Sequence, residues 1–303
     1  MIGCIGCCQS SQASCESQSS GFALVAVLIF LLVVSAITSA FALAAWTRRA
    51  VATNELQTQK LSLLAEGLTN VLAARLSGED ADVGLPLDFR PVACSASGLT
   101  IVTRLQGHAG LIDLNAADHN LLALGFASLG LDAETSRDLS IAAEYFRSGA
   151  SIFAAAAKQK VVVEGGYKFA QFESVAELQD FAPLRAVPLA ALYGTFTVNS
   201  GSGAFFAAEA SPALAALTKG KMPERTSQRA PEAAFTIQVA IMQRGSPIIG
   251  SAGYIFETRS GAGLHRSAMD PAAVPDEAAF ARATASCDPV FGSSVTGMFA
   301  VLR

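Results

Sequence analysis

The sequence predicts an α+β protein in which a long N-terminal helix, first transmembrane and then amphipathic, packs on a small antiparallel sheet that carries a large all-α insertion. Three observations predict this fold class. Residues 21–46 contain no charged side chain, an amphipathic helical pattern continues directly from them, and β-rich segments lie on both sides of a leucine-rich helical region. We call the part of the chain that follows the apolar run the head.

The apolar run from Gly21 to Trp46 predicts a membrane-spanning helix. A hydrocarbon core of about 30 Å needs roughly 20 apolar residues at a rise of about 1.5 Å per residue, and this run is longer. A cleavable secretory signal has a shorter apolar core. We therefore expect the segment to stay in the mature protein and to cross the bilayer once.

The amphipathic continuation predicts a single helix over residues 22–78. No proline occurs before Pro86, and Gly67 is the only glycine in that range before Gly78, where a stop is expected. Four leucines in the second half of the helix share one face, which predicts that this half packs on the head: Leu61, Leu64, Leu68 and Leu72.

Residues 79–106 are expected to form the first part of the sheet. The runs 87–94 and 99–106 are joined by a Ser-Ala-Ser-Gly link, which predicts a hairpin, and the second run has the β-branched residues typical of a strand. Pro86 and Pro91 place the first run at an edge of the sheet, because proline cannot donate to a strand ladder.

Residues 221–303 are expected to complete the sheet. The runs 234–244 and 248–259 are predicted strands, since apolar residues alternate at period two in the first of them. The other expected elements are a surface loop over 219–232, an irregular stretch over 260–286 with a short helix near 276–285, and a final strand over 294–302.

The region between the two β-rich parts, residues 107–220, is the predicted helical insertion. It opens with the phrase IDLNAADHN at residues 112–120, which leads into a leucine-rich helix, and Asp132 is the expected cap of a second helix over 133–148. The later pieces are a helix start at 172–178, a run at 192–198 and an echo of the first unit at 207–217.

The N-terminal arrangement resembles the type IV pilin and pseudopilin class. A short leader, residues 1–21, ends in Ser20–Gly21 and is followed by Phe22 and an uninterrupted apolar helix that opens a globular head. The resemblance implies that a prepilin peptidase cuts between Gly21 and Phe22, with methylation of the new N-terminus. In most members the fifth mature residue is glutamate, and here it is Ala26.

Lacking that acid is a feature of the K-type minor pseudopilins of type II secretion (general secretion pathway protein K family), and the insertion phrases at 112–124, 172–178 and 192–198 resemble the helical insert of that type. The resemblance implies a non-enzymatic subunit that helps start and cap a periplasmic pseudopilus. Its implied partners are other minor pseudopilins, the major pseudopilin, the prepilin peptidase and the inner membrane. Its head would be periplasmic, and Ala26 favours a place at the tip.

Two features leave alternatives open. The leader has no Lys or Arg, and Arg48 and Arg49 follow the apolar run, so the positive-inside rule alone would place the N-terminus outside.

The other candidate functions are a minor pilin of a type IV pilus and a membrane-tethered periplasmic enzyme. The three histidines, His108, His119 and His265, match no catalytic or zinc motif, and we expect them to be exposed or structural.

The six cysteines divide into four in the leader (Cys4, Cys7, Cys8 and Cys15) and two in the head. A periplasmic head would meet an oxidising environment, which makes Cys94 and Cys287 a candidate disulfide. Two free core thiols are the alternative.

Charge and composition bear on the remaining ligands. The net charge is −4 for the chain and also for residues 107–219, which hold eleven acidic and seven basic residues. This sign argues against nucleic acid as a partner, although the insertion phrase also resembles helix-hairpin-helix modules. K-type relatives bind calcium in the head, and two acidic clusters suit that ion without a motif that assigns ligands: Glu79, Asp80 and Asp82, and Asp270, Asp276 and Glu277.

Overall fold

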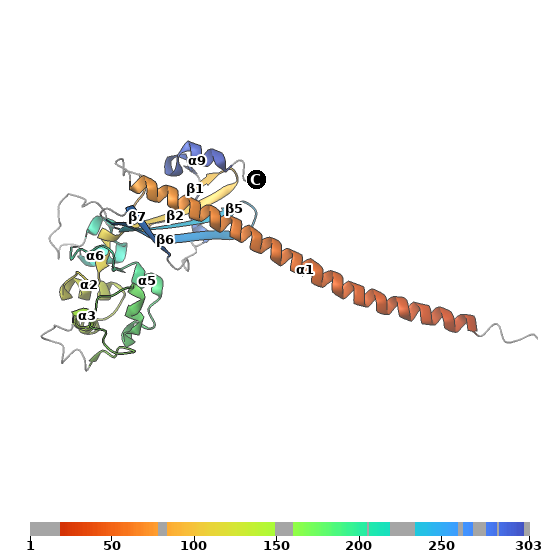
Figure 1. The fold of residues 1–303 in the computed structure, drawn as a ribbon, viewed down its shortest axis with the longest axis horizontal. Helices are drawn as coiled ribbons and strands as arrows, with labels where there is room; N and C mark the ends of the chain where they lie inside the picture. Colours follow the sequence, from red (N-terminus) through yellow and green to blue (C-terminus); the bar gives the residue numbers. More distant parts are fainter. Residues whose placement is uncertain are drawn as a thin grey trace, which may run out of the picture. The chain divides into compact units, whose positions relative to one another are not determined.

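Figure 1 shows the computed structural model of the chain. The structure describes residues 19–77, 84–148, 160–204, 206–218, 234–259, 263–268, 277–283 and 285–299. The chain divides into two compact units, Met1–Leu56 and Gln57–Arg303.

One helix, α1 (Ser19–Leu76), runs through the apolar and amphipathic segments. The prediction of a single long helix over 22–78 is confirmed, with a start three residues earlier, inside the segment expected to be the leader. At its end the backbone N–H of Ser77 donates to the carbonyl of Ala73 at 3.0 Å. The helix stays continuous because it contains no proline and because Gly67 is its only glycine after Gly21.

The head contains a six-stranded sheet with the order β7-β6-β5-β2-β1-β8. Its strands are β1 (Val92–Ala96), β2 (Leu99–Gly107), β5 (Ala234–Gln243), β6 (Ile249–Arg259), β7 (Gly263–Ala268) and β8 (Ala285–Ser286). Neighbours pair antiparallel except β1 and β8, which are parallel. The α+β class is confirmed, and the wholly antiparallel sheet is wrong in β8. Parallel strands need a crossover connection, which helix α7 (Glu277–Ala281) supplies by packing on β1 and β2.

The predicted hairpin is formed by β1 and β2. Its turn has two residues, Ser97 and Gly98, with φ of 49° and 80°, and positive φ at both positions is what a type I′ hairpin turn requires. The edge position predicted for the first strand is wrong, because β8 pairs outside β1 with Cys94 and Ser95. Pro91 lies before β1 and therefore takes no place in the ladder.

The second half of α1 packs on one face of this sheet, as Figure 1 shows. Of the predicted leucine stripe, Leu68 and Leu72 are buried and Leu61 and Leu64 are partly buried against the same core. The alternating side chains of β5 fill that core from the sheet side: Phe235, Ile237, Val239 and Ile241. The period-two and one-face predictions are both confirmed.

Helix α1 and the sheet approach closely at Gly250 in β6. A Cβ atom there would lie 2.3 Å from the Cβ of Leu61 and 2.4 Å from the backbone N of Ser62. The helix backbone therefore needs a residue without a side chain at this position.

Gly250→Ala is expected to lower the free energy of unfolding of the head by about 2 kcal/mol, because α1 must shift away from β6. Gly253→Ala in the same strand is the matched control, since its Cβ would meet only the flexible side chain of Gln238 at 3.3 Å. Hydrogen exchange of β5 and β6 amides in increasing urea measures both changes. Equal losses for the two variants would contradict the close contact.

The insertion has its own buried core, which includes Phe126, Leu139, Phe181 and Phe196. Its helices are α2 (His119–Ser128), α3 (Ala133–Ser148), α5 (Leu189–Tyr193) and α6 (Pro212–Thr218), with 3-10 turns at His108–Gly110, Val175–Asp180, Ala182–Leu184 and Ala207–Glu209. The all-α description is wrong in one detail. Strands β3 (Ile112–Asp113) and β4 (Phe196–Thr197) form a short parallel pair, which joins an early and a late segment of the insertion.

The C-terminal part differs most from prediction. The strand expected over 294–302 is wrong: helix α9 (Ser293–Met298) occupies its first part, directly after helix α8 (Asp288–Phe291). Side-chain bonds favour the helical turns, because the Asp288 carboxylate accepts from the hydroxyls of Ser286 and Thr296. The stretch over 260–286, expected to be irregular, contains β7, and the helix expected near 276–285 is the shorter α7.

Candidate functional site

The apolar part of α1 is the first candidate functional element. It is the one helix of the described chain long and apolar enough to cross a membrane, by length and composition, with a mean hydropathy of 2.8 in its most apolar window. Large side chains such as Phe22, Leu32 and Phe41 are exposed along it. An apolar surface of this extent needs lipid or other apolar helices around it.

Two of the polar side chains within this apolar run bond to the helix itself. The hydroxyl of Thr38 donates to the carbonyl of Val34 at 2.8 Å, and that of Ser39 donates to the carbonyl of Ser35 at 2.7 Å. These bonds remove the desolvation cost that unpaired hydroxyls would have in hydrocarbon. The positions of Thr38 and Ser39 are therefore compatible with a bilayer.

The expected processing junction lies near the start of α1. Gly21 and Phe22 both belong to the helix, and the side chain of Phe22 is exposed. Residues 1–18, with all four leader cysteines, lie outside the described residues. Cleavage between Gly21 and Phe22 stays a prediction.

A disulfide joins Cys94 in β1 to Cys287, which directly precedes α8, with Cα atoms 5.0 Å apart. Both residues are buried in the core under α1. Arg75 of α1 adds a second link to the same region, since its guanidinium donates to the carbonyls of Pro289 and Val290. The C-terminal helices are thus attached to the sheet by one covalent link and to α1 by hydrogen bonds.

His108 lies where the insertion leaves the sheet. It is buried, its Nδ1 lies 2.7 Å from the hydroxyl of Thr197 in β4, and its Nε2 lies 2.8 Å from the hydroxyl of Thr236 in β5. Burial lowers the pKa of His108 to about 4, so the ring is neutral at pH 7 and joins the insertion to the sheet. His119 and His265 are exposed.

The phrase at residues 112–120 builds turns and caps. The buried Asp113 carboxylate accepts from the N–H groups of Asn115 and Ala116 with one oxygen, and from Ser200 and Gly201 with the other. The Asp118 carboxylate caps α2 by accepting from the N–H of Leu121. The acids of this phrase thus position the first helix of the insertion.

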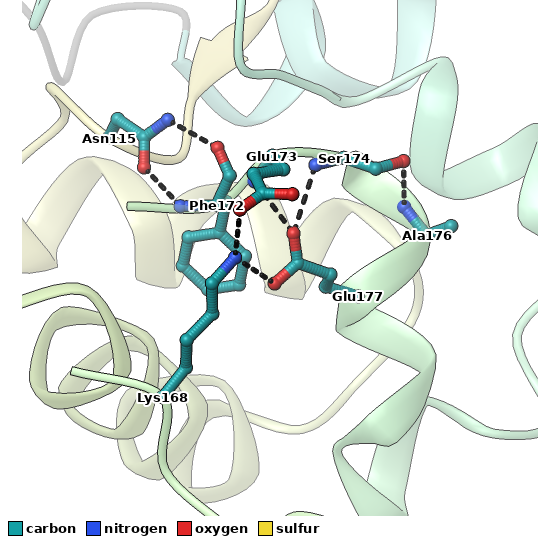
Figure 2. Close-up of polar contacts among 7 residues, drawn as sticks. All are labelled: Asn115, Lys168, Phe172, Glu173, Ser174, Ala176 and Glu177. Carbon is teal, nitrogen blue, oxygen red and sulfur yellow. Dashed lines mark hydrogen bonds and ion pairs between the residues drawn. The ribbon is translucent and has the colours of Figure 1, made fainter. Parts of the chain in front are cut away.

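Asn115 connects this turn to the next segment, as Figure 2 shows. Its amide nitrogen donates to the carbonyl of Phe172 at 2.9 Å, and its amide oxygen accepts from the N–H of Phe172 at 2.8 Å. Immediately afterwards Ser174 and Glu177 form a capping box at the start of the 3-10 turn Val175–Asp180. The segments 112–120 and 172–178 noted in the sequence therefore have structural roles in the insertion.

A groove of about 1000 Å³ opens on the head beside α1. Its basic side chains are Lys60 and Arg244. Apolar side chains of α1, of β2 and of the segment after α9 also line it: Leu61, Leu63, Leu64, Leu99 and Phe299. Leu63 is exposed there. The groove was not predicted, because its walls come from four separate segments.

No group of three His, Cys, Asp or Glu side chains within the described ranges is placed to hold a metal ion. Most of the acids considered for calcium fall elsewhere. Glu79, Asp80, Asp82, Asp270 and Asp276 lie outside the described residues, and the side chain of Glu277 is likewise not described.

Comparison with known proteins gives a match to a solved structure. No protein-family model matches the chain, and no curated protein matches it. The chain is similar to a component of a secretion complex. That component belongs to the GspK-GspI-GspJ complex of the type 2 secretion system of enterotoxigenic Escherichia coli, with 10% identity, a TM-score of 0.47, and coverage of 74% of this chain and 99% of that chain.

Proposed function

We propose that this protein is a minor pseudopilin of a type II secretion system, of the K type, anchored in the inner membrane with its head in the periplasm. One observation carries the proposal. A single continuous helix is uncharged, apolar and exposed in its first half, as a membrane anchor would be, and its second half packs in the core against the sheet of the head. Such a subunit is held in the bilayer before assembly, and exchanges lipid for neighbouring helices in a filament.

The insertion and Ala26 support a place at the tip of the filament. An uncharged Ala26 has no carboxylate for the N-terminal amine of a subunit already in place, and an unpaired ion among apolar helices costs several kcal/mol. The insertion, between β2 and β5, adds a second core to the head. Both features are best tolerated at the tip, where no subunit precedes this one and no further layer packs against the insertion. A minor pilin of a type IV pilus shares the anchor argument and is the second candidate.

Gly21→Leu is expected to block removal of residues 1–21, because a bulky side chain next to the scissile bond would not fit a peptidase that accepts glycine. Mass spectrometry of the membrane-extracted protein from cells with the prepilin peptidase measures it. Wild type should begin at Phe22, and Gly6→Leu, remote from the junction, is the matched control. A wild-type protein that keeps Met1, or begins inside the apolar run, would end the proposal.

Assembly is tested by crosslinking from the groove. A cysteine at Leu63, in the chain with the leader cysteines replaced by serine, is expected to crosslink to other pseudopilins at low stoichiometry. Substoichiometric crosslinks to two smaller minor pseudopilins support the tip position. Regular spacing along the shaft at the stoichiometry of the major subunit would overturn it.

Structural calcium in the head is a further part of the proposal, suggested by the acidic clusters of the sequence.

A further inference from the structure

A series of aromatic rings runs from the insertion core to its surface. The rings of Phe146 and Phe172 stack with centroids 4.7 Å apart, and the ring of Phe172 lies 6.3 Å from that of Phe181. These three side chains are buried. The series continues outward into three less buried rings, which we call the surface rings: Tyr145, Tyr167 and Phe169.

Phe169 is unusual in conformation and in exposure. Its φ is 55°, in the left-handed region that bulky residues rarely adopt. Its side chain is 53% exposed, whereas every other phenylalanine described between residues 57 and 303 is buried or half-buried. A strained backbone that turns an aromatic ring toward solvent points to a functional surface.

The surface rings are held in place before any partner arrives. Tyr145 lies 5.1 Å from Tyr167 and 5.2 Å from Phe169, both edge-on. The Tyr167 hydroxyl donates to the carbonyl of Val161 at 3.1 Å. Lys168 lies between Tyr167 and Phe169 in sequence. Its ammonium is 3.1 Å from the Glu173 carboxylate and 3.2 Å from that of Glu177, and Figure 2 shows both contacts. Fixed rings lose little conformational entropy on binding.

The chemistry of the surface rings favours a cation. Ring faces attract cations, and the chain satisfies two other rings itself: the guanidinium of Arg266 lies 4.3 Å from the centroid of Tyr254, and that of Arg104 lies 5.6 Å from the centroid of Phe89. In the described part of the chain, no basic side chain lies in this way over a surface ring.

Several described basic side chains of the insertion have partners elsewhere. Lys160 pairs with Glu134 and Asp138, and Arg185 pairs with Glu164. Arg147 donates to two backbone carbonyls of the insertion. Together with the net charge of −4 over residues 107–219, these contacts favour a cation that a partner supplies.

We propose that Tyr145, Tyr167 and Phe169 form a docking surface for a protein segment that presents an arginine or lysine beside an apolar side chain. The cation would lie on a ring face within the acidic surroundings, and the apolar side chain would cover the exposed part of Phe169. The surface belongs to the insertion alone and does not depend on assembly into a filament.

The test uses the full chain in detergent micelles with fluorotyrosine at its four tyrosines, which gives four ¹⁹F resonances. Two acetylated and amidated peptides, Gly-Leu-Arg-Leu-Gly and its citrulline counterpart, are the probes, since they differ in charge and little in size. The arginine peptide is expected to shift the Tyr145 and Tyr167 resonances saturably. Tyr193 and Tyr254 serve as internal controls for folding and for nonspecific binding.

The citrulline peptide is expected to bind about three-fold more weakly, the size of an exposed cation–π contact. Phe169→Ala should weaken the arginine peptide by a similar factor. Val162→Ala, which removes another exposed apolar side chain of the insertion, should leave binding unchanged. Equal binding of the two peptides, equal shifts at all four tyrosines, or no saturable shift would each overturn the proposal. If Phe169→Ala fails to fold, the comparison of the two peptides on wild type decides alone.

Discussion

Replacing Cys94 and Cys287 by alanine is expected to lower the free energy of unfolding of the head by about 3–5 kcal/mol. The disulfide joins residues 193 positions apart, and loop closure of that length is worth about 5 kcal/mol in the chain-entropy model. The bond also fixes α8 and β8, because β8 pairs with β1 through only two residues. Hydrogen exchange of β1 and β2 amides in increasing urea measures the loss.

The control uses the chain with its four leader cysteines replaced by serine. Reductant should destabilise this chain and leave the Cys94→Ala/Cys287→Ala variant unchanged, which separates the crosslink from side-chain packing. Thiol titration of the unfolded, unreduced protein should find no free cysteine. Two free thiols would rule out the pairing.

Acidification from pH 6.5 to about 4 is expected to lower the free energy of unfolding by about 3 kcal/mol through His108. Its pKa falls from 6.5 to about 4 on folding because it is buried. Between these values the unfolded chain binds a proton that the folded chain does not, so stability is fully present above pH 6.5 and falls with pH by about 1.4 kcal/mol per pH unit. Hydrogen exchange at a series of pH values, corrected for the intrinsic rate, measures the slope.

The control is His265→Gln, an exposed histidine that should leave the slope unchanged. His108→Gln should remove the slope between pH 6.5 and 4, although it also lowers stability at pH 7 by leaving a threonine hydroxyl without its ring partner. Asp132 and Asp288 do not contribute to the slope between pH 6.5 and 4. Hydrogen bonds lower the pKa of both carboxyls below 3.8, so their contribution is lost only below that pH. A slope that survives in His108→Gln would contradict the assignment.

Features with a local cause were predictable. The long helix follows from an unbroken apolar and amphipathic pattern without proline, and α3 has the predicted bounds, 133–148, because Asp132 caps it through the N–H of Thr135. Strands β5 and β6 follow from alternation and a Gly-Ser-Pro link. In each case the chain within one or two turns supplies the stabilising contacts.

Features that depend on distant partners were missed or mistaken. The sequence of β7, GLHRSA, has no strand pattern, and it becomes a strand by pairing with β6. Residues 293–298 read as β-branched and apolar, yet they are helical because Asp288, Thr296 and the buried Phe299 fix short turns against the core. The groove beside α1 and the surface rings likewise have no linear signature.

By itself the sequence determined the long apolar helix, the α+β class, the place of the insertion and the leucine face that meets the sheet, because periodicity, proline absence and capping act within a few residues. Only the tertiary structure decided the strand order, the parallel β8, the neutral state of His108 and the approach at Gly250. It also brought Cys94 next to Cys287 and Tyr145 next to Phe169. These outcomes depend on burial and on contacts between segments far apart in the chain, which no local pattern encodes.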